Sequence, residues 1–139
     1  MFQPKPRAFR KPNRFGLCTT YERKSCRLRF GSRGLQTLES GFLSVNQMEA
    51  IRRTLTSRLR RKGKVWIRAY PDYPRTAKPK EVRRGRGKGA VEGWYAILKP
   101  GRILFEAAGE NELLVRNALI FARRKIPVRV RLIERSVYL

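Results

Sequence analysis

The chain is organised around residues 73–89, which read Tyr73-Pro74-Arg75-Thr76-Ala77-Lys78-Pro79-Lys80-Glu81-Val82-Arg83-Arg84-Gly85-Arg86-Gly87-Lys88-Gly89. From Arg75 to Gly89 there are seven basic residues, one acid and three alternating glycines. Proline fixes φ and removes a backbone donor, and glycine reaches conformations closed to other residues, so neither a helix nor a central strand suits this composition. We therefore predict a long, basic, glycine-rich loop with regular elements on either side of it.

The three glycines of this loop bear on what it binds. Because glycine has no side chain to keep its backbone at a distance from a ligand, the N–H groups of Gly85, Gly87 and Gly89 can bind phosphates together with the neighbouring cations. Nucleotide-binding loops need Gly-x-Gly-x-x-Gly or Gly-Lys-Ser/Thr at the start of a helix, whereas residues 90–98 after this loop are typical of a strand. The pattern favours folded RNA as the partner, and a solvated loop without a partner is the alternative.

The overall charge points the same way. The 139 residues suit one domain, which buries roughly two thirds of the surface of its unfolded chain. Lys and Arg number 34 against 10 Asp and Glu, a net charge of +24, and self-repulsion of this size opposes compaction unless a polyanion neutralises it. Because no stretch approaches the ~20 consecutive apolar residues of a membrane-spanning helix, we expect nucleic acid as the partner and no membrane.

The residues that commonly carry catalysis are scarce. Cys18 and Cys26 are the only cysteines, and the sequence contains no histidine. Two cysteines do not supply the four ligands of a zinc site, so they are interpreted as incidental thiols, with pairing to each other or to a neighbouring chain left open. The lack of histidine removes the commonest general base, and the acids form no obvious paired motif. We predict no metal, no cofactor and no enzymatic activity.

The amino-terminal third is basic and irregular. Residues 1–33 hold ten basic residues and one acid, with aromatic residues spaced among them, including Phe9, Phe15, Tyr21 and Phe30. Their apolar content is sparse and interrupted by proline, so this stretch is predicted to order only against a partner. Arginine-rich arms with spaced aromatics neutralise phosphates and stack on unpaired bases. We therefore divide the chain into an extended RNA-binding arm at 1–33 and a single domain at 34–139, with a disordered tail as the alternative for the arm.

A helix is predicted from Val45 to Lys62. Ser44 and Gln47 have the spacing of a capping box, and Gly63 is expected to end the helix. One face is apolar and should enter the core, and it consists of Met48, Ile51, Leu55 and Leu59. Glu49 and Arg53 form an i,i+4 pair. The opposite face is basic, with Arg52, Arg53, Arg60, Arg61 and Lys62.

The remaining elements are read from alternation and turn signals. Strands are predicted at 64–70 and 128–137, and weakly at 33–40, and a hairpin about Pro100-Gly101 joins strands at 94–99 and 102–107. A second helix is predicted over 111–125, with Leu114, Ala118, Phe121 and Ala122 on its buried side. This order predicts an α+β fold with two helices packed on one face of a mainly antiparallel or mixed sheet.

Several ordered motifs then resemble a known family. They are Gly63-Lys64-Val65-Trp66-Ile67-Arg68, Tyr70-Pro71-Asp72, Thr76-x-Lys78-Pro79, Glu81-Val82-Arg83-x-Gly85-x-Gly87-Lys88-Gly89, Trp94 and Lys99-Pro100-Gly101-x-x-Leu104-Phe105-Glu106, with Gln3-Pro4-Lys5 and Phe9-Arg10-Lys11 at the start. Together they resemble the ribosomal large-subunit protein sixteen family. The resemblance implies an α+β protein that lies on large-subunit ribosomal RNA beside the aminoacyl-tRNA site, with its basic loop directed toward the peptidyl transferase centre.

The resemblance also sets the expected partners and location. It implies large-subunit rRNA, tRNA at the aminoacyl site and neighbouring ribosomal proteins as partners. Arg75, Lys80 and Arg84 make the loop more cationic than is usual in that family, and residues 15–28 and 134–139 depart from its pattern. These departures favour an organellar ribosome, in the mitochondrial matrix before the plastid stroma, with the bacterial cytoplasm as a further alternative.

The predicted function is therefore that of a structural, non-catalytic constituent of the large ribosomal subunit. A free-standing nucleic-acid enzyme or an RNA chaperone that uses the same basic surface is the alternative; an enzyme would require a carboxylate cluster or cofactor pocket that the acids do not suggest. The residues predicted to bind RNA are Lys5, Arg7, Arg10, Lys11, Arg14, Arg60, Arg61, Lys62, Arg75, Lys78, Lys80, Arg83, Arg84, Gly85, Arg86, Gly87, Lys88 and Gly89.

Overall fold

The computed structural model describes residues 4–5, 11–13, 17, 19–83, 85 and 87–135. Within these ranges the elements follow the order β1 (Arg33–Thr37), β2 (Gly41–Ser44), α1 (Val45–Arg58), β3 (Gly63–Ile67), β4 (Tyr73–Ala77), β5 (Ala90–Leu98), β6 (Ile103–Gly109), α2 (Glu112–Arg123) and β7 (Val130–Glu134). Every strand pairing is antiparallel. The predicted α+β class is confirmed, and the sheets are antiparallel rather than mixed.

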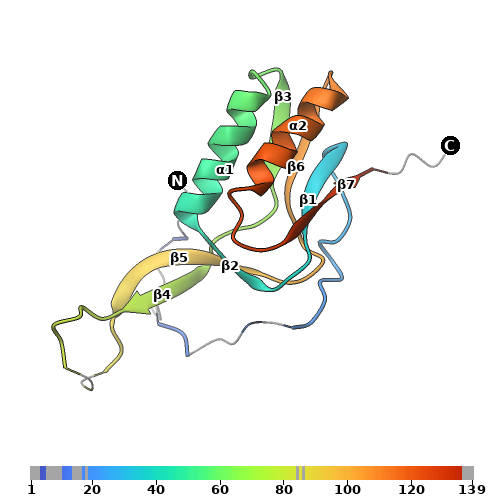
Figure 1. Cartoon of the computed structure of the whole chain (residues 1–139). Coiled ribbons are helices and arrows are strands. Elements are labelled where there is room, and N and C mark those ends of the chain that lie inside the picture. The colour runs from blue at the N-terminus through green and yellow to red at the C-terminus, as the bar shows by residue number, and fades with distance from the viewer. Residues whose placement is uncertain are drawn as a thin grey trace.

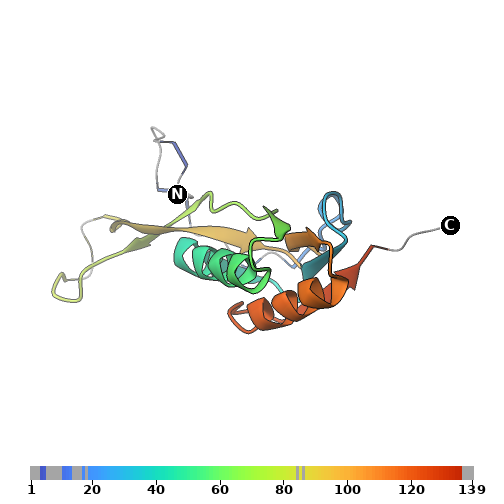
Figure 2. The same ribbon diagram turned by 90° about the horizontal axis from the view of Figure 1, so that it is seen from above.

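The strands form two sheets where the sequence predicted one. Strands in the order β3-β6-β1-β7 form a four-stranded sheet, and β2-β5-β4 form a three-stranded sheet. Both helices lie on the same side of the strands, as Figure 2 shows from above. α1 packs on β2, β3 and β5, while α2 packs on β1, β6 and β7 and the two helices contact each other. The core therefore lies between one helical layer and the inner faces of both sheets.

The first helix has the predicted start and an earlier end. The Ser44 side chain accepts a hydrogen bond from the Gln47 N–H, and the Gln47 side chain accepts one from the Ser44 N–H, which confirms the capping box. The predicted apolar face is also confirmed, since Met48, Ile51, Leu55 and Leu59 are all buried. The helix ends at Arg58, before the predicted Lys62, because Arg60 and Arg61 adopt φ values of 50° and 61°.

The left-handed backbone conformation of Arg60 and Arg61 forms the turn between α1 and β3. Gly63 is therefore the first residue of β3 and not the residue that ends the helix, as the sequence predicted.

The buried side of the second helix differs from the prediction at one important residue. Ala118 and Ala122 are buried as predicted, and Val115 and Leu119 complete the face that enters the core. Phe121, by contrast, is 37% exposed. In a helix of 3.6 residues per turn, Phe121 lies about 100° from Ala122 and about 200° from Leu119, so the ring points away from the sheet.

The start of the basic stretch is a strand, which corrects the prediction that all of residues 73–89 form a loop. Tyr73–Ala77 is β4, and it pairs only with β5, so it lies at the edge of its sheet. Proline is compatible with such an edge because one side of the strand needs no donors, and Pro74 is buried there. A register shift between Arg75 and Thr76 marks an irregularity in the pairing.

The turn at Pro100-Gly101 is confirmed, but the predicted hairpin is not. Gly101 has φ 86°, and the N–H of Arg102 donates to the carbonyl of Lys99, which fits a tight turn of the type that favours Pro-Gly. The strands on either side nevertheless enter different sheets, since β5 pairs with β2 and β4 while β6 pairs with β1 and β3. This turn therefore connects the two sheets.

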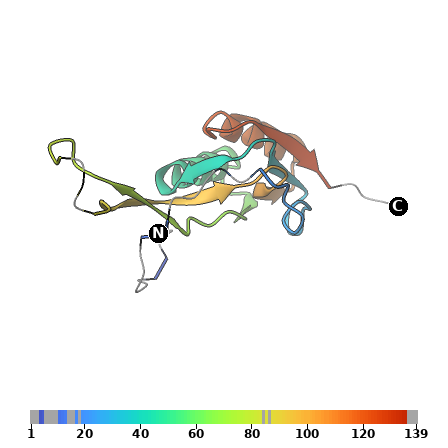
Figure 3. The same ribbon diagram turned by 90° about the horizontal axis from the view of Figure 1, so that it is seen from below.

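Residues 22–31 pack on the face of the sheets opposite the helices, as Figures 2 and 3 show. Their backbone is tied to the turn and to β6, because the Glu22 N–H donates to the Pro100 carbonyl and the Ile103 N–H donates to the Ser25 carbonyl. The Phe30 ring stacks on Trp66 of β3 with ring centres 6.1 Å apart. These contacts hold residues 22–31 against the sheets, and the extended arm at 1–33 stays a prediction.

A fully buried carboxylate fixes this segment. Glu106 of β6 accepts hydrogen bonds from the N–H groups of Arg29, Phe30 and Gly31 at 3.1, 2.7 and 2.8 Å, and it forms an ion pair with Arg68. Burial alone raises the pKa of Glu106, but the hydrogen bonds from Gly31, Phe30, Arg68 and Arg29 outweigh burial and hold the pKa below its usual value. Glu106 is therefore a charged group inside the protein whose hydrogen-bonding capacity is met by its own chain.

Candidate nucleic-acid interface

The predicted basic loop is carried by a two-stranded ribbon. β4 and β5 pair from Tyr73 opposite Tyr95 to Ala77 opposite Ala90, and the loop at residues 78–89 joins their ends. Figures 1 and 3 show this ribbon extending away from the helices, with the loop at its far end. Since β5 continues into the sheet that packs against α1, the ribbon presents the loop at a fixed distance from the core.

The described residues of the loop are open to solvent. Lys78, Lys80, Arg83 and Lys88 are exposed. Gly85 and Gly87 have φ values of 104° and 81°, and a Cβ added at either position would meet no atom within 4 Å. These two glycines are therefore needed for backbone conformation, not for packing. The Lys78 ammonium donates to the Gly85 carbonyl across the loop, while Arg84 and Arg86 lie outside the described residues.

Gly89 has a packing role that the sequence did not indicate. A Cβ at residue 89 would lie 2.2 Å from the carbonyl oxygen of Ala77, which is backbone and cannot move aside easily. The residue thus allows the two sides of the loop to approach at its base. Gly89 is half-buried, whereas Gly85 and Gly87 are exposed.

Part of the amino-terminal arm lies against the loop. The Lys11 ammonium donates to the Lys88 carbonyl at 3.2 Å, and the Lys88 ammonium donates to the Pro12 carbonyl. Residues 77 positions apart in the sequence are thereby joined into one basic surface. Lys5 is exposed, whereas Arg7, Arg10 and Arg14 lie outside the described residues. We call the surface of residues 11–13, 78–83, 85, 87 and 88 the loop surface.

Arg75 is only partly available to a ligand. Its guanidinium donates to the Tyr95 hydroxyl at 3.1 Å and lies 5.5 Å from the centre of the Tyr95 ring. Glu92 is 4.0 Å away, and the Arg75 side chain stays 61% exposed. The hydrogen bond with Tyr95 raises the pKa of Arg75, so the side chain remains charged.

The predicted residues at the end of α1 are not part of the loop surface. Arg60, Arg61 and Lys62 are exposed in the turn between α1 and β3. Figure 1 shows this turn at the top of the molecule and the loop at the lower left. The basic residues predicted as one set thus form two separate surfaces.

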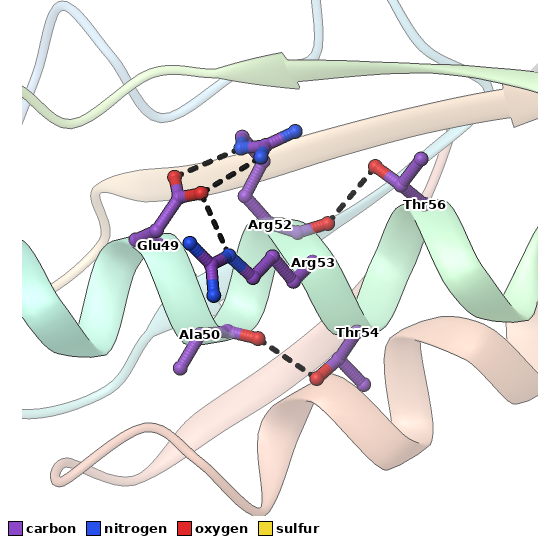
Figure 4. A network of polar contacts seen from close by, with 6 residues as sticks. All are labelled: Glu49, Ala50, Arg52, Arg53, Thr54 and Thr56. Carbon is purple, nitrogen blue, oxygen red and sulfur yellow. Dashed lines mark hydrogen bonds and ion pairs between the residues drawn. The ribbon is translucent and has the colours of Figure 1, made fainter. Parts of the chain in front are cut away.

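The basic face of α1 is partly neutralised at its amino-terminal end. Glu49 accepts from the guanidiniums of Arg52 and Arg53, with shortest distances of 2.7 and 3.0 Å, as Figure 4 shows. The hydrogen bonds from Arg52 and then Arg53 lower the pKa of Glu49 to about 2. The predicted i,i+4 pair of Glu49 and Arg53 is confirmed, but the sequence missed the competing partner Arg52 at i+3.

The chemistry available to the described residues is binding. No group of three or more His, Cys, Asp or Glu side chains among them is arranged to hold a metal ion. In the same residues, no helix is long and apolar enough to cross a membrane. Exposed Lys and Arg on a narrow ribbon, next to glycines with exposed backbone, are suited to neutralise the closely spaced phosphates of RNA.

Comparisons with known proteins show that the chain is similar to members of one ribosomal protein family. The family described as "Ribosomal protein L16p/L10e" matches residues 4–133. The large ribosomal subunit protein uL16 of Psychrobacter cryohalolentis is 44% identical over 137 residues, which cover 99% of each chain. The protein of the same name from Psychrobacter arcticus has the same identity and coverage. The family match includes the loop, both helices, β1 to β6 and all of β7 except its last residue, Glu134.

Proposed function

The chain belongs to the ribosomal protein L16p/L10e family, and from this premise we propose that its loop surface supports the positioning of tRNA near the aminoacyl site of the large ribosomal subunit. As a family member it is a structural, non-enzymatic constituent of that subunit, with rRNA and neighbouring ribosomal proteins as partners. The observation that carries the proposal is the paired β4–β5 ribbon, which carries exposed cations on the loop at its far end, away from the helices.

Two features of the loop surface support a nucleic-acid ligand. Lys80, Arg83 and Lys88 have no acidic partner among the described residues, so their charge is available to phosphates. The carbonyls that Lys78 and Lys88 contact are neutral, and such hydrogen bonds leave the positive charge uncompensated. Arg83 also occupies the Val-Arg-x-Gly motif on which the family resemblance rests.

Recognition by this surface is proposed to depend on phosphates and RNA shape rather than on base sequence. The exposed side chains are cations, which hold phosphates, and the narrow ribbon can follow a groove or a junction between helices. Binding of the full chain to large-subunit rRNA should then fall with salt, with a slope on the order of −0.7 to −0.9 per neutralised phosphate.

The comparisons also bear on the cellular compartment of the ribosome that contains this chain. The two relatives named above are bacterial proteins, so they give no support to the predicted mitochondrial location. The mitochondrial matrix stays a prediction, with the plastid stroma and the bacterial cytoplasm as alternatives. Sedimentation of the native protein with ribosomes from isolated organelles or from cytosol decides among them.

The proposed role is tested with large subunits that carry Lys80→Ala, Arg83→Ala and Lys88→Ala together. A charge-assisted hydrogen bond to phosphate contributes about 1.5 to 3 kcal/mol, so loss of even one contact should weaken tRNA binding at the aminoacyl site about tenfold or more. Binding of aminoacyl-tRNA is measured on particles of matched protein content.

The control variant removes the same charge elsewhere. Lys64→Ala, Arg116→Ala and Arg123→Ala change three exposed cations on β3 and α2, outside the β4–β5 ribbon and its loop. These subunits should bind tRNA as the unaltered ones do. Equal tRNA binding by the loop variant and the control would refute the proposal, whereas a similar loss in both would show a general effect of charge.

A further inference from the structure

A second cationic surface lies on the outer side of the two helices, around the exposed ring of Phe121. The Cζ atom of Arg58 lies 3.8 Å from the centre of this ring, and that of Arg124 lies 5.3 Å from it. The ring is 37% exposed despite its size. Two guanidiniums from different helices therefore meet at one solvent-facing aromatic side chain, an arrangement that each cation stabilises through the ring's negative face.

Phe121 lines two depressions of the surface. One is also lined by Arg53, Thr54, Ser57, Arg58, Arg124 and Lys125. The other is also lined by Ser57, Arg58, Arg60, Leu114, Asn117 and Ala118. Neither lining includes an acidic residue. We call the surface formed by Ser57, Arg58, Phe121, Arg124 and Lys125 the helix surface.

The charges of the helix surface are not compensated within the described chain. Arg58, Arg124 and Lys125 form no ion pair with any described acidic residue, in contrast to Arg52 and Arg53, which share Glu49. A cation–π contact with Phe121 uses no acidic partner, so the guanidinium N–H donors can still reach a ligand. The surface thus offers an exposed aromatic ring with two guanidiniums beside it, unpaired cations and a hydroxyl from Ser57.

This combination fits an RNA strand with an unpaired nucleotide. Guanidinium edges and an ammonium hold phosphates, while an aromatic ring with adjacent guanidinium planes is a platform for a base. An acidic protein surface would match the charge but would not need the stacked planes. Because the chain is a constituent of the large subunit, we propose that the helix surface is a second rRNA-binding site, separate from the loop surface, that holds a single-stranded segment beside Phe121.

The proposal is tested directly by Phe121→p-benzoylphenylalanine in the full chain, incorporated into large subunits that keep the loop intact. Irradiation of purified particles should crosslink the chain to rRNA, at nucleotides that are unpaired in the folded RNA. A crosslink to a ribosomal protein, or none from particles shown to contain the chain, would overturn it. Because tRNA binding is not the readout, this result is independent of the role proposed for the loop.

A second measurement applies even if that variant does not enter subunits. The full chain with Arg58→Gln and Arg124→Gln is compared with the charge-matched chain with Arg116→Gln and Arg123→Gln, which lie on α2 outside both depressions. The probe is large-subunit rRNA transcribed in vitro. The first variant should reduce the magnitude of the salt slope of binding by about 1.4 to 1.8 and the control should not. Equal slopes for the two variants would contradict the proposal.

Discussion

The Glu106 carboxylate and the loop at residues 78–89 are both charged. The charge of Glu106 is compensated by groups of the same chain, whereas the cations of the loop face solvent. Glu106 is fully buried and is satisfied by three backbone N–H groups and Arg68 of the same chain. The loop holds six basic residues and one acid, and its described cations face solvent. A charge matched inside the fold stabilises the fold, whereas cations left unmatched on a projecting ribbon are available to a polyanion.

The largest effect is expected where this internal match is broken. Glu106→Gln removes the charge that faces Arg68, whose side chain is only 12% exposed, and should cost about 3 to 5 kcal/mol in the free energy of unfolding. Urea unfolding at neutral pH measures it. Glu112→Gln is the control, because that carboxylate is 70% exposed and its pair with Arg33 should contribute about 0 to 1 kcal/mol.

The pH dependence of this variant gives a further check. Since the folded pKa of Glu106 lies below its unfolded value, its stabilisation is present above the usual carboxyl range and is lost as the pH falls through the folded pKa. The difference between the unaltered chain and Glu106→Gln should shrink in acid. A difference that is constant with pH would mean that the charge of Glu106 does not stabilise the fold.

The next effect contrasts two apolar side chains that the sequence placed in the same core. Leu55 is fully buried, so Leu55→Ala should cost about 2 to 5 kcal/mol through lost burial and a residual cavity. Phe121 is partly exposed, and Phe121→Ala should cost clearly less, about 1 kcal/mol from its cation–π contacts and partial burial. Thermal unfolding of both chains compares them, and equal losses would show that Phe121 is buried.

A smaller effect is expected at the exposed network on α1. Glu49 has a folded pKa of about 2, so its stabilisation is present above its ordinary value of 4.5 and is lost as the pH falls toward 2. Glu49→Gln should therefore unfold slightly earlier than the unaltered chain at pH 7, and the two should converge near pH 2. Urea midpoints over this range measure the convergence, and raised salt should weaken the effect at neutral pH.

The smallest effect on stability is expected in the loop itself. Lys80→Ala, Arg83→Ala and Lys88→Ala remove side chains that bury no apolar surface, so the free energy of unfolding should change by no more than about 0.5 kcal/mol per substitution. The same chain should lose affinity for rRNA. A strongly destabilised loop variant would erase the contrast with Glu106, because it would make the loop cations part of the fold.

Much of the fold could be predicted because its signals are local. The capping box at Ser44 and the apolar spacing of α1 depend only on residues of one helix and its cap, and both are confirmed. Pro100-Gly101 identified its turn for the same reason. What the turn joins could not be predicted, because β5 and β6 pair with strands far away in the sequence and enter different sheets.

The candidate site divides in the same way. The clustering of Lys and Arg with alternating glycines in residues 75–89 is visible in the sequence, but its separation from Arg60, Arg61 and Lys62 is not. Lys11 and Lys88 are 77 positions apart, so no local pattern in the sequence predicts their contact. The meeting of Arg58 and Arg124 at the Phe121 ring was not predicted, because it depends on how the two helices pack.

By itself, the sequence determined the class of the protein: a basic, α+β, RNA-binding chain of a ribosomal family, since charge, helix periodicity and ordered motifs do not depend on distant contacts. Only the tertiary structure decided which charges are structural and which are available. Glu106 and Lys88 are each one charged residue in the sequence, but one is surrounded by donors from residues 29–31 and the other lies in a solvent-exposed loop. Burial and the identity of neighbours set the energy of a charge, and both arise only when distant segments pack.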